Sequence, residues 1–126
     1  MPALNRVQLI GNLGKDPETR FTTKGNKYCR FTIAVNRRWK NEDGEPQEIT
    51  DWFNIEAWDR LGEVCQEYLH KGSLVFLEGR MQTNRYEHEG ETRVITKVVL
   101  QSMQMLDRKG PPEEPEDVIE EEPGIE

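Results

Sequence analysis

The chain has 126 residues, which is enough for one domain with a hydrophobic core, although its apolar fraction of 34% is low and its charged fraction of 33% is high. Residues 109–126 hold one lysine and eight acidic residues and account for the whole formal net charge of −7, so residues 1–108 are neutral. No run approaches the roughly 18 apolar residues of a membrane span, and the N-terminus lacks the apolar stretch of a secretory signal, so neither class of protein is expected.

The first half of the chain predicts three strands. Residues 5–13 form an apolar run that ends at Gly14, as expected of a first strand. Apolar and polar side chains alternate over residues 29–36, which predicts a half-buried second strand. After a polar turn over residues 41–46, a third strand has its core face at Phe53, Ile55 and Ala57.

The period then changes to that of a helix between residues 60 and 71. Asp59 is the expected N-cap and Gly72 the expected stop. Two further strands, over residues 74–81 and 93–100, flank a turn at residues 87–90. One stripe of the helix collects its apolar residues, Leu61, Val64, Cys65, Tyr68 and Leu69.

Three strands, one helix and two strands is the element order of an OB-fold, an all-β, five-stranded Greek-key barrel with a short helix between strands 3 and 4. Other small α+β domains share this order. Residues 109–126 carry prolines and acidic residues without periodicity, so they cannot offset their ordering entropy. The sequence therefore predicts a folded domain over residues 1–108 and a disordered acidic tail over residues 109–126.

Four large aromatic residues fall outside the predicted core. Trp52 and Trp58 have the opposite parity to the core face of the third strand. Trp39 stands among cationic residues, and Tyr86 lies in a polar hairpin beside Arg85. Aromatic rings beside cations are the arrangement expected of a stacking platform for unpaired bases.

Each aromatic residue also has a structural interpretation. Trp52 and Trp58 can instead pack under the helix or against another subunit. Tyr86 can anchor a protein interface, because tyrosine is common at interfaces of many kinds. The four together favour base stacking, since one structural explanation would have to cover all of them.

The sequence offers no support for catalysis, a cofactor or a metal site. Cys29 and Cys65 have neither zinc-ligand spacing nor the pattern of a disulfide framework, and both fall on apolar faces. They are expected to be buried thiols of a cytoplasmic protein. His70 and His88 are isolated, and no nucleophile or carboxylate pair stands out.

Three sequence blocks resemble bacterial single-stranded DNA-binding proteins: residues 5–20 (NRVQLIGNLGKDPETR), 67–73 (EYLHKGS) and 75–79 (VFLEG). The resemblance covers about residues 4–106. It implies an OB-fold, a homotetramer, sequence-tolerant binding of single-stranded DNA, association with the nucleoid, and roles in replication, recombination and repair.

The family's stacking positions carry over to Trp39, Trp52, Trp58 and Tyr86. Trp58 stands where many members have phenylalanine, and Tyr86 where some have tryptophan. Two cationic positions also match the family, Arg60 and Lys71. Proximity to the aromatic residues adds further candidate phosphate contacts, Arg37, Arg38, Lys40, Arg80 and Arg85.

The end of the chain departs from the family. Members commonly end in an acidic tip closed by a hydrophobic residue, usually phenylalanine, which docks on replication and repair partners. The matching tip residues are Glu120, Glu121, Glu122, Ile125 and Glu126. Because a charged residue ends the chain, recruitment of partners through this tip is expected to be weak.

Two other functions remain open on the same fold. The aromatic residues can be interface anchors of a protein–protein adaptor. The barrel can also bind RNA or an oligosaccharide.

Overall fold

The computed structural model describes residues 2–107. The predicted tail, residues 109–126 with its five tip residues, lies outside the described residues, as does the predicted domain boundary at residue 108. The described elements, in chain order, are β1 (Val7–Leu13), β2 (Glu18–Phe21), β3 (Lys27–Lys40), β4 (Pro46–Trp58), α1 (Asp59–Tyr68), β5 (Leu74–His88) and β6 (Glu91–Met105).

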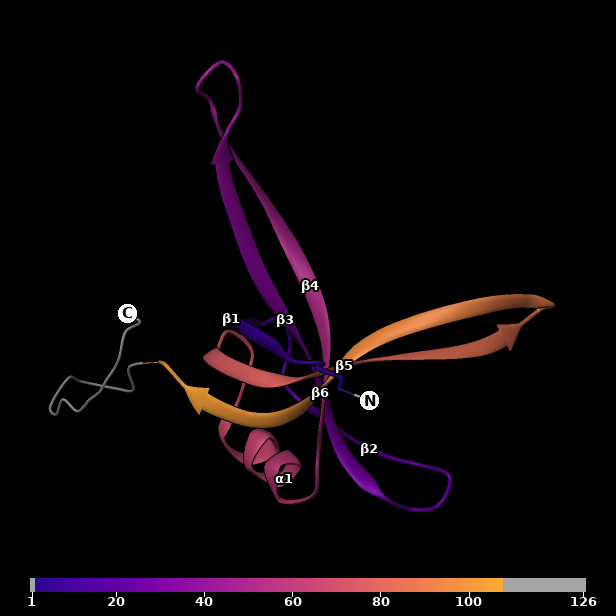
Figure 1. The fold of residues 1–126 in the computed structure, drawn as a ribbon. Coiled ribbons are helices and arrows are strands. Elements are labelled where there is room, and N and C mark those ends of the chain that lie inside the picture. Colours follow the sequence, from indigo (N-terminus) through magenta and orange to yellow (C-terminus); the bar gives the residue numbers. More distant parts are fainter. Residues whose placement is uncertain (1, 108–126) are drawn as a thin grey trace, which may run out of the picture.

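The strands form a closed barrel, which confirms the predicted fold class. They follow the order β1-β5-β6-β4-β3, and a further pairing of β1 with β3 closes this five-stranded ring (Figure 1). The helix lies between the third and fourth barrel strands, β4 and β5, and covers one end of the barrel. Alternate residues of the strands point inward and make the core with Cys65 of α1 and Leu69, the residue that follows α1.

The short strand β2 was not predicted. It pairs with residues 27–30 of β3. The same edge of β3 pairs with β1 at Ile33 and Ala34. All four of its residues are exposed, so no alternation of apolar and polar residues marks it in the sequence.

The helix ends differ from the prediction. Asp59 is the first helical residue rather than the N-cap, and its φ is 56°. The N-cap is Trp58, which makes no capping hydrogen bond through its side chain. The helix stops at Tyr68, because Leu69 turns extended and buries its side chain, and Gly72 serves the following turn with a φ of 91°.

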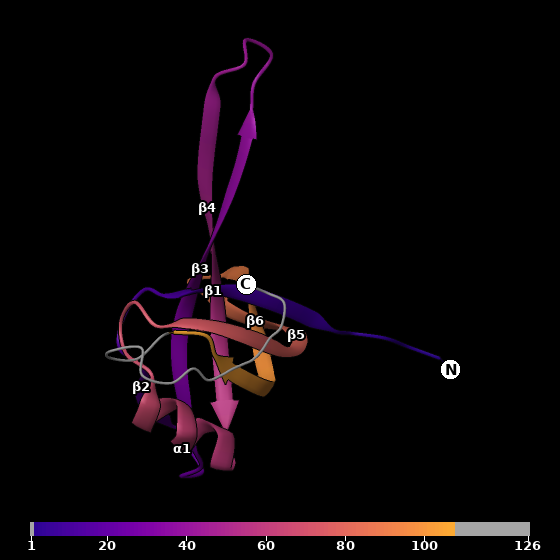
Figure 2. The ribbon, with the colours of Figure 1, turned by 90° about the vertical axis from the view of Figure 1, so that its left-hand side faces the viewer.

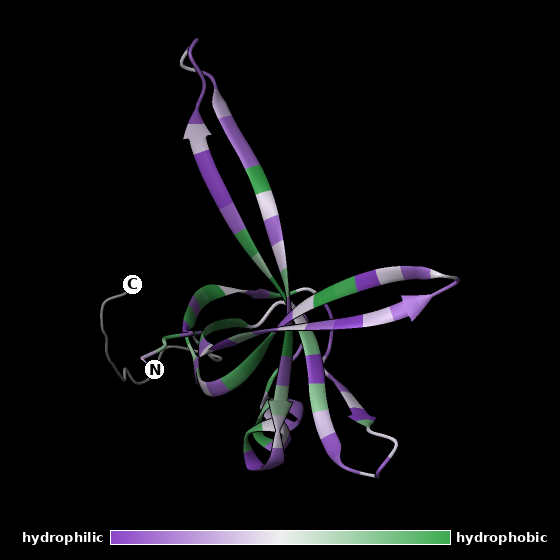
Figure 3. Ribbon diagram, turned by 45° about the vertical axis from the view of Figure 1, so that its right-hand side comes forward, coloured by the Kyte–Doolittle hydropathy of each residue, from purple (hydrophilic) through white to green (hydrophobic). Residues whose placement is uncertain are grey.

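Two hairpins extend beyond the barrel as long arms (Figure 1), and Figure 2 shows the one formed by β3 and β4 from a second side. We call residues 36–50 the β3–β4 arm and residues 82–97 the β5–β6 arm. The second arm ends in a two-residue turn at Glu89 and Gly90, both with positive φ, which suits the twist of a tight hairpin. Figure 3 shows both arms as mainly hydrophilic with a few apolar bands, and the exposed apolar residues in them include Ile49, Val94 and Ile95.

Among residues 2–107, no helix has the length and apolar character needed to cross a membrane.

Candidate nucleic-acid interface

Strand register places the predicted aromatic residues on particular sides of the sheet. Directly paired residues point to the same side, and a row of such pairs crosses four strands, from Arg30 to Glu56, then Val99, then Arg80. This side faces away from the barrel core, and we call it the outer face. With every second residue counted along each strand, the outer face also carries Tyr28, Trp52, Trp58, Lys97, Arg93 and Tyr86.

Trp52 lies on this face, paired with Ala34 of β3, and is 60% exposed. Its indole ring covers Gly14, so closely that a Cβ atom on that glycine would lie 2.5 Å from Cζ3 of the ring. Asp16, two residues after Gly14, accepts a hydrogen bond from the backbone N–H of Lys71 at 2.7 Å. Trp52 and Lys71 therefore both adjoin the segment that follows β1.

Trp58 is half-buried rather than exposed, about 20 Å further along β4. Tyr28 stacks on its ring, with the ring centroids 4.6 Å apart and the planes inclined by 22°. Its indole N–H donates to Glu56 at 3.2 Å. A surface depression of about 450 Å³ adjoins the ring, bounded also by Asn26, Lys27, Asp59 and Glu63.

Tyr86 lies in the β5–β6 arm and is 44% exposed. Its partner across the hairpin is Arg93, so a cation and an aromatic ring lie side by side on one face of the arm. Arg85, which the sequence placed beside Tyr86, pairs with Val94 and points to the opposite face.

Trp39 differs from the other three aromatic residues. It pairs with Gln47 in the β3–β4 arm, and its parity is that of the inward residues Phe31 and Ile33. The arm carries this side beyond the barrel, where Trp39 is 46% exposed. The Arg37 guanidinium lies over the ring, 5.9 Å from its centroid.

The predicted cations fall into two groups. Three of them contact carboxylates: Arg37 with Asp51 at 2.7 Å, Arg38 with Glu48 at 3.5 Å, and Arg60 with Glu63 at 3.6 Å. The hydrogen bond from Arg37 to Asp51 raises the pKa of Arg37, so this side chain stays charged. The others make no ion pair within residues 2–107: Lys40, Lys71, Arg80 and Arg85.

Several residues of the outer face were not predicted from the sequence. Tyr28 and Arg30 belong to β3, and Arg93 and Lys97 belong to β6. The turn over residues 87–90 contained the signal for Arg93, because a two-residue turn at residues 89 and 90 fixes which residue lies opposite Tyr86. Lys97 had no such signal, since its partner Glu56 comes from a strand far away in the sequence.

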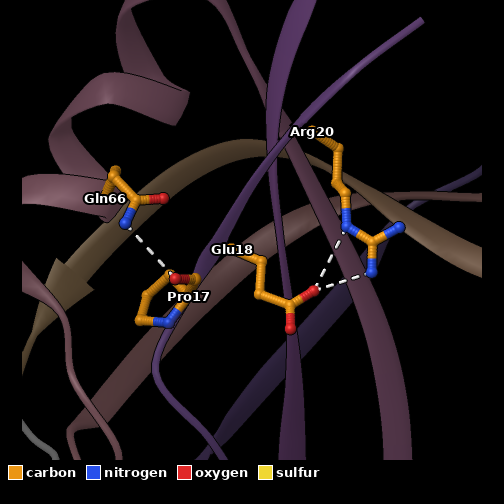
Figure 4. Close-up of polar contacts among 4 residues, drawn as sticks. All are labelled: Pro17, Glu18, Arg20 and Gln66. Atoms are coloured by element: carbon orange, nitrogen blue, oxygen red, sulfur yellow. Dashed lines mark hydrogen bonds and ion pairs between the residues drawn. The ribbon is translucent and has the colours of Figure 1, made fainter.

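A cluster of polar side chains holds β2 against α1, near the first residues of β3. Gln66 donates to the Pro17 carbonyl at 3.3 Å and accepts from the Thr19 hydroxyl at 2.7 Å. Figure 4 shows the first of these contacts beside the ion pair of Glu18 and Arg20, which lowers the pKa of Glu18. Glu18 and Arg20 pair directly with Arg30 and Tyr28, so this ion pair lies at the edge of the outer face and compensates the charge of Glu18 there.

Cys29 and Cys65 are buried, free thiols, as the sequence predicts. Burial raises the pKa of Cys29 to about 11, and burial with the nearby Cys29 raises that of Cys65 to about 12. Within the described residues, no three side chains of histidine, cysteine, aspartate or glutamate are grouped so as to hold a metal ion.

The closed barrel and its open face of aromatic and cationic side chains define an OB-fold protein, a class whose members bind oligomers along the surface of the sheet. The sequence pattern of the single-strand binding protein family matches residues 4–106. The chain therefore belongs to that family, and the predicted resemblance is confirmed.

Similar proteins agree with this assignment. Single-stranded DNA-binding protein 1 of Chlorobaculum tepidum is 43% identical over 108 residues, which cover 84% of this chain and 67% of the relative. The single-stranded DNA-binding protein of Neisseria meningitidis is 41% identical over 105 residues, covering 82% of this chain and 60% of the relative. The matched region thus spans about two thirds or less of these relatives.

Two solved structures share the fold. The Plasmodium falciparum SSB in complex with single-stranded DNA has a TM-score of 0.77 at 28% identity, and the match covers 85% of this chain and 98% of the other. A deletion mutant of the single-stranded DNA-binding protein of Thermus aquaticus has a TM-score of 0.73 at 29% identity, with 85% and 52% covered.

Proposed function

We propose that this chain binds single-stranded DNA without sequence specificity and protects and organises it during replication, recombination and repair. Bases stack on Trp52, Trp58, Tyr86 and Trp39, and nearby cations contact the phosphates. The proposal contains no catalytic step and needs no cofactor.

The observation that carries this proposal is the composition of the outer face. Three of the four aromatic residues share it with cations from three strands, Arg30, Arg80 and Arg93. Stacking on an aromatic ring contributes about 1–3 kcal/mol per base and accepts any base. Duplex DNA hides the faces of its bases, so this surface favours unpaired strands.

The phosphate contacts add a term that depends on salt. Each contact with a single strand contributes about −0.7 to the slope of log K against log salt concentration. Because three of the predicted cations already pair with carboxylates, we expect a smaller slope than the count of lysine and arginine residues alone indicates.

A fluorescence titration tests the proposal directly, since the chain holds three tryptophans and all of them lie in the candidate site. Strong quenching by oligo-dT, with none by a duplex, is the expected result. Equal quenching by oligo-U would indicate an RNA-binding protein, and quenching by oligosaccharides alone a sugar-binding one. No response to any of these ligands would favour a protein–protein adaptor.

We further propose a homotetramer. Ile10 is 44% exposed on β1 and pairs with the half-buried Phe76 of β5, on the side of these strands that faces away from the core. A second copy of the chain covering this apolar pair would explain why the two residues lie outside. Light scattering measures the assembly, and a mass equal to that of one or two chains would contradict the homotetramer.

The remaining parts of the proposal concern the cell. DNA binding and the reduced thiols favour a cytoplasmic, nucleoid-associated protein. The acidic tip, Glu120, Glu121, Glu122, Ile125 and Glu126, is proposed as a weak site for replication and repair proteins.

A further inference from the structure

The outer face contains a carboxylate where phosphate groups are expected to pass. Glu56 lies on β4 between Trp52 and Trp58. Every second residue of this strand points to the outer face, so Glu56 and both tryptophans share that face. It is one of two buried polar residues described, with 8% of its surface exposed. A buried carboxylate without a partner is costly and would also repel the DNA backbone.

Both oxygens of this carboxylate have partners. Lys97 of β6 donates from Nζ to Oε2 at 2.7 Å, and its side chain is 18% exposed. The indole N–H of Trp58 donates to Oε1 at 3.2 Å. Lys97 thus compensates the charge of Glu56 while Glu56 contacts the tryptophan.

These contacts restrict Trp58 from two directions. Tyr28 covers one face of the ring, and Glu56 fixes the edge that carries the N–H group. A ring fixed in this way does not lose rotational freedom when a base stacks on its remaining face.

We propose that Glu56 and Lys97 are positioning residues for Trp58, which hold its ring ready for a base and keep the outer face free of uncompensated negative charge. The inference rests on the proposed binding of single-stranded DNA. Neither residue needs to contact DNA for this role.

The test uses Trp58 as its own reporter. The variant Trp39→Phe/Trp52→Phe leaves Trp58 as the one tryptophan of the chain. Its emission is recorded without DNA and then during titration with oligo-dT, and thermal melting confirms folding of every variant.

Two double variants in this background have the same net charge and similar side-chain size. Glu56→Gln/Lys97→Gln keeps an acceptor for the indole N–H, whereas Glu56→Met/Lys97→Met has none. Replacement of a buried pair by apolar residues commonly preserves stability, so both are expected to fold.

We expect the glutamine pair to retain the emission of Trp58 and to bind oligo-dT within about twofold of its background. The methionine pair should show altered emission and bind about three- to tenfold more weakly, because the freed ring must be ordered on binding. Equal emission and equal affinity of the two double variants would overturn the positioning role.

Single variants test the charge compensation with tryptophans intact. Lys97→Gln removes the cation that compensates Glu56, and we expect a loss of affinity of about five- to tenfold. Lys97→Arg restores the charge and should bind within about twofold of the wild type. Equal affinities for the two variants would refute this part of the inference.

Failure of the proposed function gives a different result. If the wild-type chain does not bind oligo-dT, the function is wrong, yet the emission of Trp58 in the free protein still reports on its contact with Glu56. If the wild type binds but the methionine pair matches the glutamine pair in emission and affinity, the function stands and the positioning role is wrong.

Discussion

Individual side chains of the candidate interface are held by neighbours that differ from ring to ring. Arg37 lies over Trp39, and Asp51 fixes Arg37 in turn. Trp52 lies over Gly14, and Trp58 stacks on Tyr28. Each of these rings therefore has one supported side, and under the proposed function this support lowers the entropy that stacking of a base would cost.

The clearest prediction for a single residue concerns Trp52. Substitution Trp52→Ala should weaken binding of oligo-dT by about 1–3 kcal/mol, because a stacking face is lost. The domain should remain folded, since the ring is 60% exposed. Titration and thermal melting measure the two effects, with Trp52→Phe as the control that retains a ring. Unfolding of the alanine variant would show that Trp52 is structural.

Gly14 offers a second prediction at this scale. In Gly14→Ala the new Cβ would lie 2.5 Å from the Trp52 ring, so the ring has to move. We expect weaker binding, up to the loss caused by Trp52→Ala, or about 1–3 kcal/mol. The matched control is Gly14→Ala combined with Trp52→Ala, where the glycine change should have no further effect on affinity. An additive loss would contradict a role through Trp52.

At the scale of elements, strands and faces follow from periodicity, whereas ends and long-range pairs do not. The alternation around Phe53, Ile55 and Ala57 was enough to place Trp52 and Trp58 on the other side of β4. The helical stripe also predicted burial of Cys65 and Leu69. Its ends were wrong, because the tertiary positions of Trp58 and Leu69 decide where the helix begins and stops.

In the candidate site, too, local patterns predicted which face a residue lies on but not which residues meet across strands. Sequence proximity placed Arg85 beside Tyr86, but neighbours along a strand point to opposite faces, and Arg93 across the hairpin is the adjacent cation. The pair of Glu56 and Lys97 joins segments that meet only in the folded barrel. Local patterns contain no information about such a contact.

The β3–β4 arm supports a prediction about charge. Reversal of Arg37 and Arg38 to glutamate should lower affinity for oligo-dT and reduce the salt slope by about 1.4, if both arginines contact phosphates. The reverse experiment neutralises their partners, with Asp51→Asn and Glu48→Gln, and should steepen the slope. Binding isotherms at several salt concentrations measure both. An unchanged slope in the glutamate variant would place the DNA away from this arm.

The packing of α1 on β3 leads to a prediction about pH. The pKa of Cys29 is raised from 9.0 to about 11 and that of Cys65 to about 12. Above pH 9 the unfolded chain releases these protons while the folded chain keeps them, so stability falls as the pH rises toward 11. Thermal melting from pH 8 to 11 should show a smaller decline for Cys29→Ala/Cys65→Ala than for the wild type. Equal declines would mean that the thiols do not contribute.

For the whole molecule, the main feature is the separation of charge along the chain. Residues 1–108 are neutral, and residues 109–126 carry all of the net charge of −7. A tethered anionic segment competes with DNA for the same cations at high effective concentration. We therefore expect the acidic tail to regulate the affinity of the barrel.

Removal of residues 109–126 should strengthen binding of single-stranded DNA, most clearly at low salt. The gain should fade as the Debye length falls to about 3 Å near 1 M salt. Titrations of both chains over a range of salt measure the effect, and thermal melting serves as the control for folding. A large loss of stability on truncation would refute the description of the tail as an electrostatic competitor.

One irregularity of the sheet sets how the molecule tolerates changes in length. The register of β5 and β6 shifts between Glu78 and Gly79, where β6 holds one extra residue three pairs before the β5–β6 arm begins. Because the arm extends beyond the barrel, insertions at its tip leave the barrel core in place. Two residues added to each strand would lengthen the arm and keep Tyr86 beside Arg93 on the same face, whereas one residue added beyond the bulge would invert every side chain that follows. Homologous arms should accordingly differ in length by even steps per strand.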